Sequence, residues 1–274
     1  MTIMRRTFLG AAIAAAALST GAWAQPGATA TSTYTPSVGQ SGKDVVWVPT
    51  SQSLVDRMLD MVKLTPQDRL VDLGSGDGRL VITAAKRGAT ARGIEFNPDM
   101  VALSKRFAQA EGVANRATFE KADIFQSDFS NATVVTLFLL PDLNLRLRPK
   151  LLDMKPGTRV VSNTFDMGDW EPDESLQGAD NCAGHCTAYK WIVPAKVAGT
   201  WKLADREFAL TQTYQKVQGT MREEGRTVPV TGRLDGTRIV LSAGNENYTG
   251  EVNGKAMEGT TEGGKRWSAT LVSR

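Results

Sequence analysis

The stretch from Arg69 to Gly78, RLVDLGSGDG, has the composition of a ligand-binding turn between a strand and a helix. The apolar residues around Asp72 suit a strand that is buried on both faces of a parallel sheet. Alternate glycines from position 74 onward permit positive φ angles, and they let a ligand lie against bare backbone at the start of a helix. The residues that follow, up to Lys86, have the apolar spacing of such a helix.

Two further acids stand at the ends of the next two predicted strands. Glu95 lies near the end of the segment 90–96, about 20 residues beyond the glycine loop, where a carboxylate can bind both hydroxyls of a ribose. Asp123 ends the segment 117–123, where it can bind the exocyclic amine of an adenine. Ligands of such sheets bind outside the carboxyl ends of the strands, so these groups predict a nucleoside site.

The acids also indicate which nucleoside cofactor fits. A dinucleotide-binding loop has the pattern G-x-G-x-x-G and directs backbone amides at a pyrophosphate. This loop is G-x-G-x-G, with Asp72 before it and Asp77 inside it. Two carboxylates repel a pyrophosphate and favour an ammonium or a sulfonium. We therefore predict S-adenosylmethionine, which carries both cations, as the cofactor, and S-adenosylhomocysteine as its product. A plain βα turn would explain the glycines but not the acids.

The strings DLGSGDG, GIEFNP and KADIF together resemble the class I S-adenosylmethionine-dependent methyltransferases. VWVPTSQSLVDRML, DLGSGDGRLVITAAKRGATARGIEFNP and PGTRVVSNTF narrow the resemblance to small protein-lysine methyltransferases, whose members modify the ATP synthase c subunit. The resemblance covers roughly 45–194. It implies a Rossmann-like α/β fold, with a doubly wound, mostly parallel sheet of the seven-stranded type, and a protein lysine, not a nucleic acid, as the methyl acceptor.

The resemblance also implies that the segment with Pro49 and Thr50 lies over the cofactor, although a simple lead-in to the next helix is an equal alternative. Asp72, Gly74, Gly76 and Asp77 would hold the methionine end, Glu95 the ribose and Asp123 the adenine. The full set of predicted cofactor-binding residues is Pro49, Thr50, Asp72, Gly74, Ser75, Gly76, Asp77, Glu95, Asn97, Asp123, Ile124 and Leu140. Asn97 is in addition the predicted N-cap of a helix that begins at Pro98.

Catalytic residues are not assigned by the sequence, and three candidates remain. Asp142 follows Leu140-Pro141, where many amino-methylating relatives have Asn/Asp-Pro-Pro-Tyr, but it can equally be a helix N-cap, which is the interpretation we favour. Phe165 and Trp170 could form an apolar slot that desolvates a lysine and so favours its neutral, nucleophilic form. Their alternative role is packing beneath a loop.

Cys182-Ala-Gly-His-Cys186 contains both cysteines and the single histidine of the chain. Three ligands within five residues do not form a structural zinc pattern, because no fourth partner of the usual spacing is present. We predict no metal site, and we expect Cys182 and Cys186 to form a disulfide in an exported chain. His185 lies outside every motif above, so we assign it no role.

The sequence divides into four segments. Residues 1–24, with MRRTFLG, an alanine-rich run and Ala-Trp-Ala, predict a twin-arginine signal peptide and a periplasmic or exported protein; an uncleaved membrane anchor is the alternative. Residues 25–44 have the polar composition of a flexible tether. Residues 45–195 form the predicted methyltransferase domain, and 196–274, with alternating runs and the turns Asp235-Gly236 and Asn253-Gly254, predict an antiparallel meander or small barrel.

The whole chain has 274 residues, of which 41% are hydrophobic, and this is enough for two hydrophobic cores. Its formal charge of +3 gives no reason to expect a polyanionic partner. The function predicted first is methyl transfer to an amine, most readily a protein lysine. A non-catalytic nucleoside-sensing module is the alternative that an export signal favours, since S-adenosylmethionine is made in the cytoplasm. A small-molecule methyltransferase is the third. The sequence does not indicate the oligomeric state.

Overall fold

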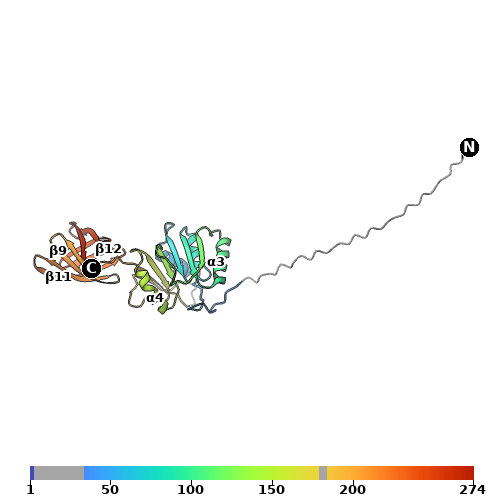
Figure 1. Cartoon of the computed structure of the whole chain (residues 1–274), viewed down its shortest axis with the longest axis horizontal. Helices are drawn as coiled ribbons and strands as arrows, with labels where there is room; N and C mark the ends of the chain where they lie inside the picture. Colours follow the sequence, from blue (N-terminus) through green and yellow to red (C-terminus); the bar gives the residue numbers. More distant parts are fainter. Residues whose placement is uncertain (3–33, 179–183) are drawn as a thin grey trace. The chain divides into compact units, whose positions relative to one another are not determined.

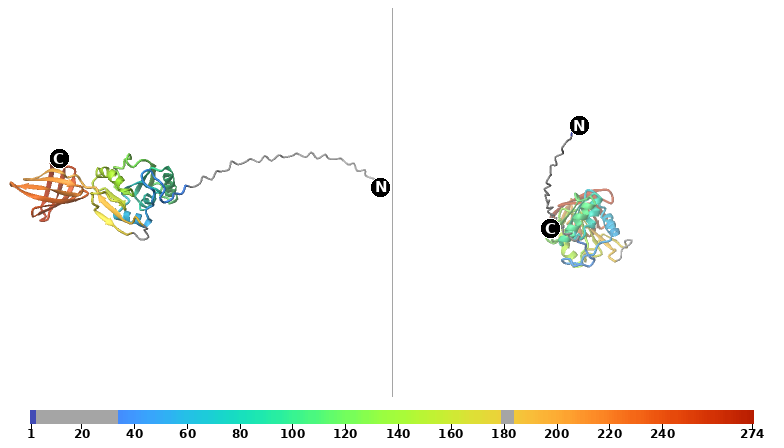
Figure 2. Two further views of the ribbon diagram at one scale, coloured as in Figure 1. Left: turned by 90° about the horizontal axis from the view of Figure 1, so that it is seen from below. Right: turned by 90° about the vertical axis from the view of Figure 1, so that its right-hand side faces the viewer.

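The computed structural model describes residues 1–2, 34–178 and 184–274. Most of the predicted signal peptide and the first part of the predicted tether lie outside the described residues. The remainder contains a mixed α/β part followed by an all-β part (Figures 1 and 2). The last strand of the α/β part ends at Ile192 and the first strand of the all-β part begins at Gly199.

A seven-stranded sheet forms the centre of the α/β part. Its strands are β1 (Arg69–Leu73), β2 (Thr90–Glu95), β3 (Ala117–Lys121), β4 (Val134–Leu137), β5 (Arg159–Asn163), β6 (Glu174–Leu176) and β7 (Ala188–Ile192). They lie in the order β3-β2-β1-β4-β5-β7-β6, with β1 to β5 parallel and the last two strands antiparallel to their neighbours. The strand order reverses between β1 and β4, and ligands of such sheets bind at this switch point.

The predicted doubly wound sheet is therefore confirmed, and its core explains why. Leu70 of β1 packs in the cluster on one face of the sheet, and Val71 packs in the cluster on the other face. All four residues of β4 are buried. The sequence does not predict β6, because a three-residue strand with two exposed positions carries no recognisable pattern.

The helices are α1 (Gln52–Met61), α2 (Arg79–Lys86), α3 (Pro98–Ala110) and α4 (Pro141–Leu152). Ser51 caps α1 by accepting a hydrogen bond from the Leu54 amide at 3.3 Å, and Asn97 caps α3 as predicted. The favoured interpretation of Asp142 as an N-cap is wrong. α4 begins two residues earlier than an Asp142 cap would require, because Pro141 is well suited to the first helical position; Leu140 is the N-cap and Asp142 lies in the first turn. None of the helices in the described ranges has the length and apolarity to cross a membrane.

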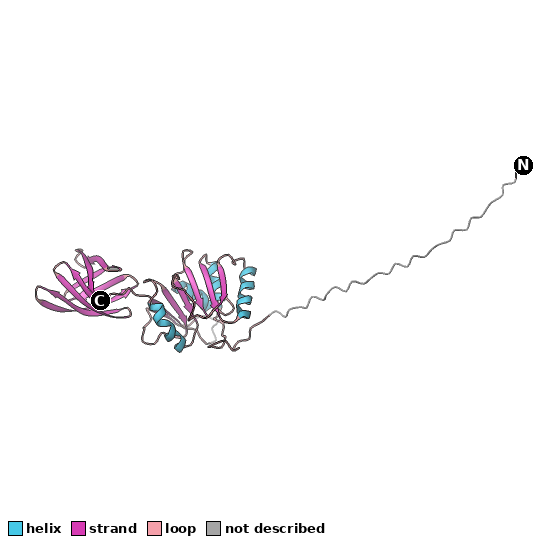
Figure 3. Ribbon diagram, in the orientation of Figure 1, coloured by secondary structure: helices cyan, strands magenta, loops and turns pink. Residues whose placement is uncertain are grey.

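The C-terminal part is a closed, eight-stranded antiparallel barrel that contains strands only (Figure 3). Its strands are β8 (Gly199–Leu203), β9 (Arg206–Thr213), β10 (Lys216–Glu223), β11 (Arg226–Asp235), β12 (Arg238–Ala243), β13 (Glu246–Asn253), β14 (Ala256–Thr261) and β15 (Arg266–Ser273). Side chains alternate between the interior and the solvent, so Trp201, Phe208 and Tyr248 fill the centre. The predicted barrel is confirmed.

Two-residue turns join several of the barrel strands. Asp235 pairs with Arg238 and Asn253 pairs with Ala256, so both predicted hairpin turns are present. Between β9 and β10 the turn is formed by Tyr214 and Gln215, and Tyr214 has a φ of 54°, which is unusual for a residue other than glycine. A tightly wound two-residue turn requires this conformation, and contacts outside the barrel hold it in place, as described below.

Candidate functional site

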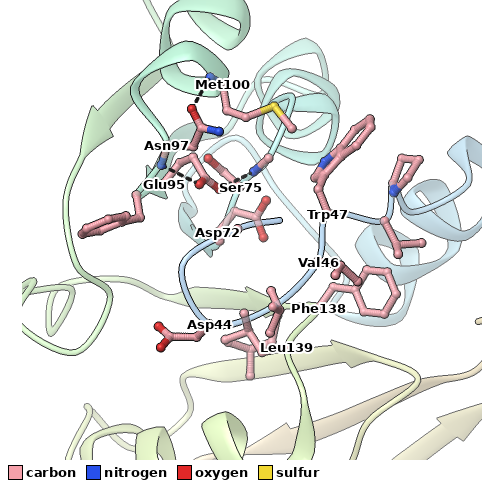
Figure 4. A pocket seen from close by; sticks show the side chains of 18 of the residues that line it. Asp44, Val46, Trp47, Asp72, Ser75, Glu95, Asn97, Met100, Phe138 and Leu139 are labelled. Atoms are coloured by element: carbon pink, nitrogen blue, oxygen red, sulfur yellow. Dashed lines mark hydrogen bonds between the residues drawn. The ribbon is translucent and has the colours of Figure 1, made fainter. Parts of the chain in front are cut away.

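A cavity of about 570 Å³ lies at the carboxyl edge of the sheet. All the predicted cofactor-binding residues line it, from the segment before α1, the glycine loop and the ends of β2, β3 and β4. Figure 4 shows Asp72 in its centre, with Glu95 and Asn97 on one side and Phe138 and Leu139 on the other. A pocket of this size is in the range that small-molecule ligands occupy.

Asp72 is a buried carboxylate that forms no ion pair with any of the described residues. Its Oδ1 atom accepts a 2.6 Å hydrogen bond from the Thr136 hydroxyl of β4. Burial is the main reason why its pKa is raised from 3.8 to about 7; the Thr136 hydrogen bond opposes the increase, and the charges of Glu95 and Asp77 add to it. The site therefore stabilises a positive charge placed next to Asp72.

Glu95 is held by the backbone that surrounds it. One carboxylate oxygen accepts a hydrogen bond from the Gly76 amide at 3.0 Å, and the other accepts one from the Asn97 amide at 2.9 Å. The carboxylate thus connects the glycine loop to the start of α3. Each oxygen retains a lone pair, so Glu95 can still accept hydrogen bonds from a ligand.

The glycine loop approaches its covering segment closely. Gly76 has a φ of 52°, and a Cβ atom at this position would lie 2.6 Å from Nε1 of Trp47. Only glycine meets both demands. The Ser75 hydroxyl beside it is buried and has no hydrogen-bond partner among the described residues. A bare backbone, this hydroxyl and the Asp72 carboxylate form a donor and acceptor set that fits the amino-acid end of S-adenosylmethionine.

Asp77 differs from Asp72 because it already has a cation. Arg79 at the start of α2 binds the Asp77 carboxylate at 2.6 Å, and its other terminal nitrogen donates a 2.8 Å hydrogen bond to the Thr50 carbonyl. Arg79 thereby attaches the segment before α1 to the glycine loop. Asp77 lines the cavity as predicted, but its charge is balanced within the chain.

The segment 40–50 forms one wall of the cavity, and we call it the strap. The structure differs here from the predicted tether, since residues 40–44 line the cavity. A bridge between Ser41 and Val46 shapes the strap, and Lys43 forms a 2.6 Å ion pair with Asp123. Polar contacts rather than apolar packing hold these residues, which is why their composition is that of a tether. The Lys43 hydrogen bond is also the main cause of the lowered pKa of Asp123.

Three aromatic rings line the other half of the cavity. The centroids of Phe138 and Phe165 are 6.2 Å apart, and His185 lies 5.3 Å from Phe138 and 6.1 Å from Phe165. The sequence indicates only Phe165. Phe138 escapes notice because it continues the apolar run of β4, and His185 because it lies 20 residues from the nearest motif. The sequence feature that could have identified His185 is its position just before an antiparallel strand, because such a strand starts at the ligand-binding edge of the sheet.

The other two catalytic candidates do not line this cavity. Asp142 is exposed on α4. Trp170 is fully buried, with its ring 5.9 Å from those of Trp191 and Tyr214, so the structure places it in the packing role that we gave as its alternative. Cys182 lies outside the described residues, so the disulfide with Cys186 stays a prediction.

Comparison with known proteins decides the family. Residues 72–174 match the family model of the ANTKMT methyltransferase domain. The chain is 41% identical over 152 residues to the protein-lysine N-methyltransferase of Saccharolobus islandicus, in an alignment that covers 54% of this chain and 94% of that protein. The chain belongs to this family of S-adenosylmethionine-dependent methyltransferases. Its cofactor is accordingly S-adenosylmethionine, which supplies an activated methyl group when bound.

Two further relatives are covered over very different shares of their own length. A human lysine N-methyltransferase that is named for the ATP synthase c subunit is 38% identical over 128 residues, and the chain spans 54% of that protein. Among solved structures, an RNA methyltransferase from Salinibacter ruber in complex with S-adenosylhomocysteine is 45% identical, with a TM-score of 0.51. The match covers 55% of this chain and 96% of that one. About half of this methyltransferase is thus shared with each of these relatives.

Proposed function

We propose that this methyltransferase transfers methyl groups to a lysine side chain of a protein outside the cytoplasm. The assignment of a lysine acceptor rests on the 41% identity to a protein-lysine N-methyltransferase, of which the chain covers 94%. The cavity supports it, because its polar half suits the cofactor and its aromatic half leaves an apolar surface for an acceptor.

The proposed roles of the polar residues follow from their charges. Asp72 would hold the ammonium group of the cofactor beside the Gly74–Gly76 backbone, and Glu95 would accept hydrogen bonds from both ribose hydroxyls. Asp123 would bind the adenine amine, and for this it must share its carboxylate with Lys43. Ile124 and Leu140 would pack against the adenine and near the methyl group, respectively.

The charges around the cavity support a protein acceptor over a nucleic acid. Among the described residues that line the cavity, the lysine and arginine side chains are those of Lys43 and Arg79 only, and both are paired with carboxylates. Binding to a nucleic acid depends on cations that are free to contact phosphates. The rim instead carries exposed apolar side chains, among them Val46 and Phe96, which suit a protein surface.

The proposed location rests on residues 1–24, whose paired arginines, apolar run and Ala-Trp-Ala sequence resemble a twin-arginine signal. Twin-arginine export moves folded proteins, so a chain could leave the cytoplasm with its cofactor bound. Repeated turnover outside would then need a supply of S-adenosylmethionine. Fractionation of cells that produce the full chain tests this proposal, and a protein found only in the cytoplasm without cleavage would contradict it.

Two measurements test the function itself. Calorimetry with the chain from Gln25 onward should show micromolar binding of S-adenosylmethionine and S-adenosylhomocysteine. Methyl-labelled cofactor should then label a component of an extract from the same compartment, and that label should be sensitive to protease and resistant to ribonuclease. A label that is sensitive to ribonuclease would show that the acceptor is RNA and not a protein lysine. Binding of both ligands without any transfer would favour the nucleoside-sensing alternative.

A further inference from the structure

We infer that Phe138, Phe165 and His185, which we call the aromatic wall, form the subsite that binds the acceptor lysine side chain. This inference rests on the proposed function and names the site that would carry out its recognition step. The three rings come from separate parts of the sequence, and no motif of the chain connects them.

The topology of the sheet brings the rings to one place. Phe138 directly follows β4, Phe165 follows β5 by two positions, and His185 precedes β7 by three. These strands are neighbours in the sheet, and β7 runs antiparallel to β5, so its start lies at the edge where β4 and β5 end. The acids Asp72 and Glu95 belong to β1 and β2 in the other half of the sheet. The cavity thus has separate regions for the two ligands.

The chemistry of the aromatic wall fits a long alkyl chain that ends in a cation. The rings present a continuous apolar surface on which four methylene groups can pack. Their faces attract an ammonium or a methylated ammonium. Among the described residues, the carboxylates that line the cavity are Asp44, Asp72, Asp77, Glu95 and Asp123, and none of them comes from β4, β5 or residues 184–187 before β7. An amine on the wall is therefore held without a strong ion pair, and desolvation favours its neutral form.

The backbone around the wall is held firmly, as a binding site requires. Asn144 of α4 is fully buried, and its amide donates hydrogen bonds to the carbonyls of Phe165 at 3.2 Å and Asp166 at 3.0 Å. Thr164 and His185 have φ angles of 63° and 52°, in a region that side chains other than glycine rarely adopt. Such conformations persist where surrounding contacts impose them, and they are frequent in ligand sites. Asn144 is thus a positioning residue for Phe165.

The single histidine of the chain makes a direct test possible. An untagged protein saturated with S-adenosylhomocysteine has one imidazole, so its ¹⁵N-labelled ring gives one unambiguous set of NMR signals. The probes are Nα-acetyl-lysine methylamide, its trimethylated form, and the norleucine counterpart, which has the alkyl chain without the cation. We expect saturable shifts of the His185 signals with the two cationic probes and binding weaker by about 3- to 30-fold with norleucine.

Matched variants connect the shifts to the wall. Phe165→Leu keeps an apolar side chain but removes the ring, and it should weaken binding of the trimethylated probe by about 3- to 30-fold. Phe107→Leu is the control, because Phe107 is an exposed phenylalanine on α3 that does not line the cavity. It should leave the affinity unchanged. Asn144→Ser should lower it while binding of S-adenosylhomocysteine persists.

The outcomes separate this inference from the proposed function. Failure of the wild-type protein to bind S-adenosylhomocysteine would contradict the cofactor site itself. Normal binding of S-adenosylhomocysteine with no His185 shift by either lysine probe would overturn the aromatic wall as the acceptor subsite. Shifts produced by adenosine or uridine, but not by the lysine probes, would overturn it in favour of a nucleoside acceptor.

Discussion

At the scale of single residues, Asp72 shows how a ligand site can cost stability before the ligand arrives. Its pKa is raised from 3.8 to about 7 in the folded protein, mainly by burial. Between these values Asp72 binds more protons in the folded state than in the unfolded state, so its own contribution to the free energy of unfolding falls as the pH rises from about 4 to about 7. The neighbouring charges of Glu95 and Asp77 act in the same direction.

We predict that Asp72→Asn raises the free energy of unfolding of the cofactor-free protein at pH 7.5 by about 1–3 kcal/mol relative to the wild type, and that this difference grows as the pH rises from about 4 to about 7. The same change should weaken S-adenosylmethionine binding, because a neutral amide cannot balance a cation. Denaturant titrations at several pH values measure the first effect. Asp205→Asn, in an exposed barrel turn, is the control that should leave the profile as it is. A difference in stability between the variant and the wild type that stays constant from pH 4 to pH 7 would exclude this account of Asp72.

Glu95 gives a prediction about affinity alone. Glu95→Ala should weaken binding of S-adenosylhomocysteine by about 1.5–3 kcal/mol, because it removes charged hydrogen bonds to the ribose. It also frees the amides of Gly76 and Asn97, two residues that line the cavity. Because both residues line the cavity, water can bind their amides in place of the carboxylate. The temperature of thermal unfolding should therefore change little. Calorimetry measures the affinity, and Glu111→Ala, which breaks only a surface pair with Lys86, is the matched control. Unchanged binding would refute the ribose role.

At the scale of elements, the strap would compete with the cofactor for Asp123 if this residue binds the adenine, as we propose. The Lys43 ammonium lies 2.6 Å from the Asp123 carboxylate, whose pKa it lowers, and 5.0 Å from the centre of the Phe96 ring. Both partners are accessible to solvent, so the pair is screened by salt and easily opened. The strap is accordingly a wall that the cofactor can rearrange at little cost.

We expect Lys43→Gln to increase the affinity for S-adenosylhomocysteine by about two- to fivefold at low salt, and less at high salt, because Asp123 becomes free for the adenine amine. Lys105→Gln, on the exposed side of α3, should have no such effect. Titrations at two ionic strengths measure the difference. If the variant binds more weakly instead, Lys43 contacts the cofactor directly, and the strap helps binding rather than competing with it.

The elements also show what the sequence could and could not predict. β1, α2 and β2 were predictable because their apolar periods, the glycine loop and the acid at the end of β2 agree with one another. The strap was not, since its order comes from Lys43 meeting Asp123, 80 residues later. The same limit applies to the aromatic wall. His185 and Phe138 meet because β7 runs antiparallel beside β5. The pattern of residues 189–193 does predict a closing antiparallel strand, but no local pattern shows that a residue three positions before β7 reaches the cavity.

At the scale of the whole molecule, the barrel contacts the loop that follows Phe165. The Tyr214 hydroxyl donates a 2.9 Å hydrogen bond to Asp169, and its ring stacks on Trp170. Gln215, which is fully buried, donates a 2.8 Å hydrogen bond to the Glu171 carbonyl. The β9–β10 turn thus supports the loop 166–173 from outside the sheet, and through it the position of Phe165. We therefore expect the barrel to influence the half of the cavity in which we place the acceptor.

Gln215→Ala tests this expectation, because it removes the side-chain hydrogen bond from the barrel turn to the Glu171 carbonyl. We predict a loss of about 1–3 kcal/mol in the free energy of unfolding and faster amide exchange in residues 166–173. Gln218→Ala, an exposed position three residues further along the chain, should change neither. S-adenosylhomocysteine affinity should persist in both variants, since the polar half of the cavity lies on β1 to β3. Faster exchange confined to the barrel would mean that its turn stabilises only itself, and the support of the acceptor half would have to come from Asn144 and α4 alone.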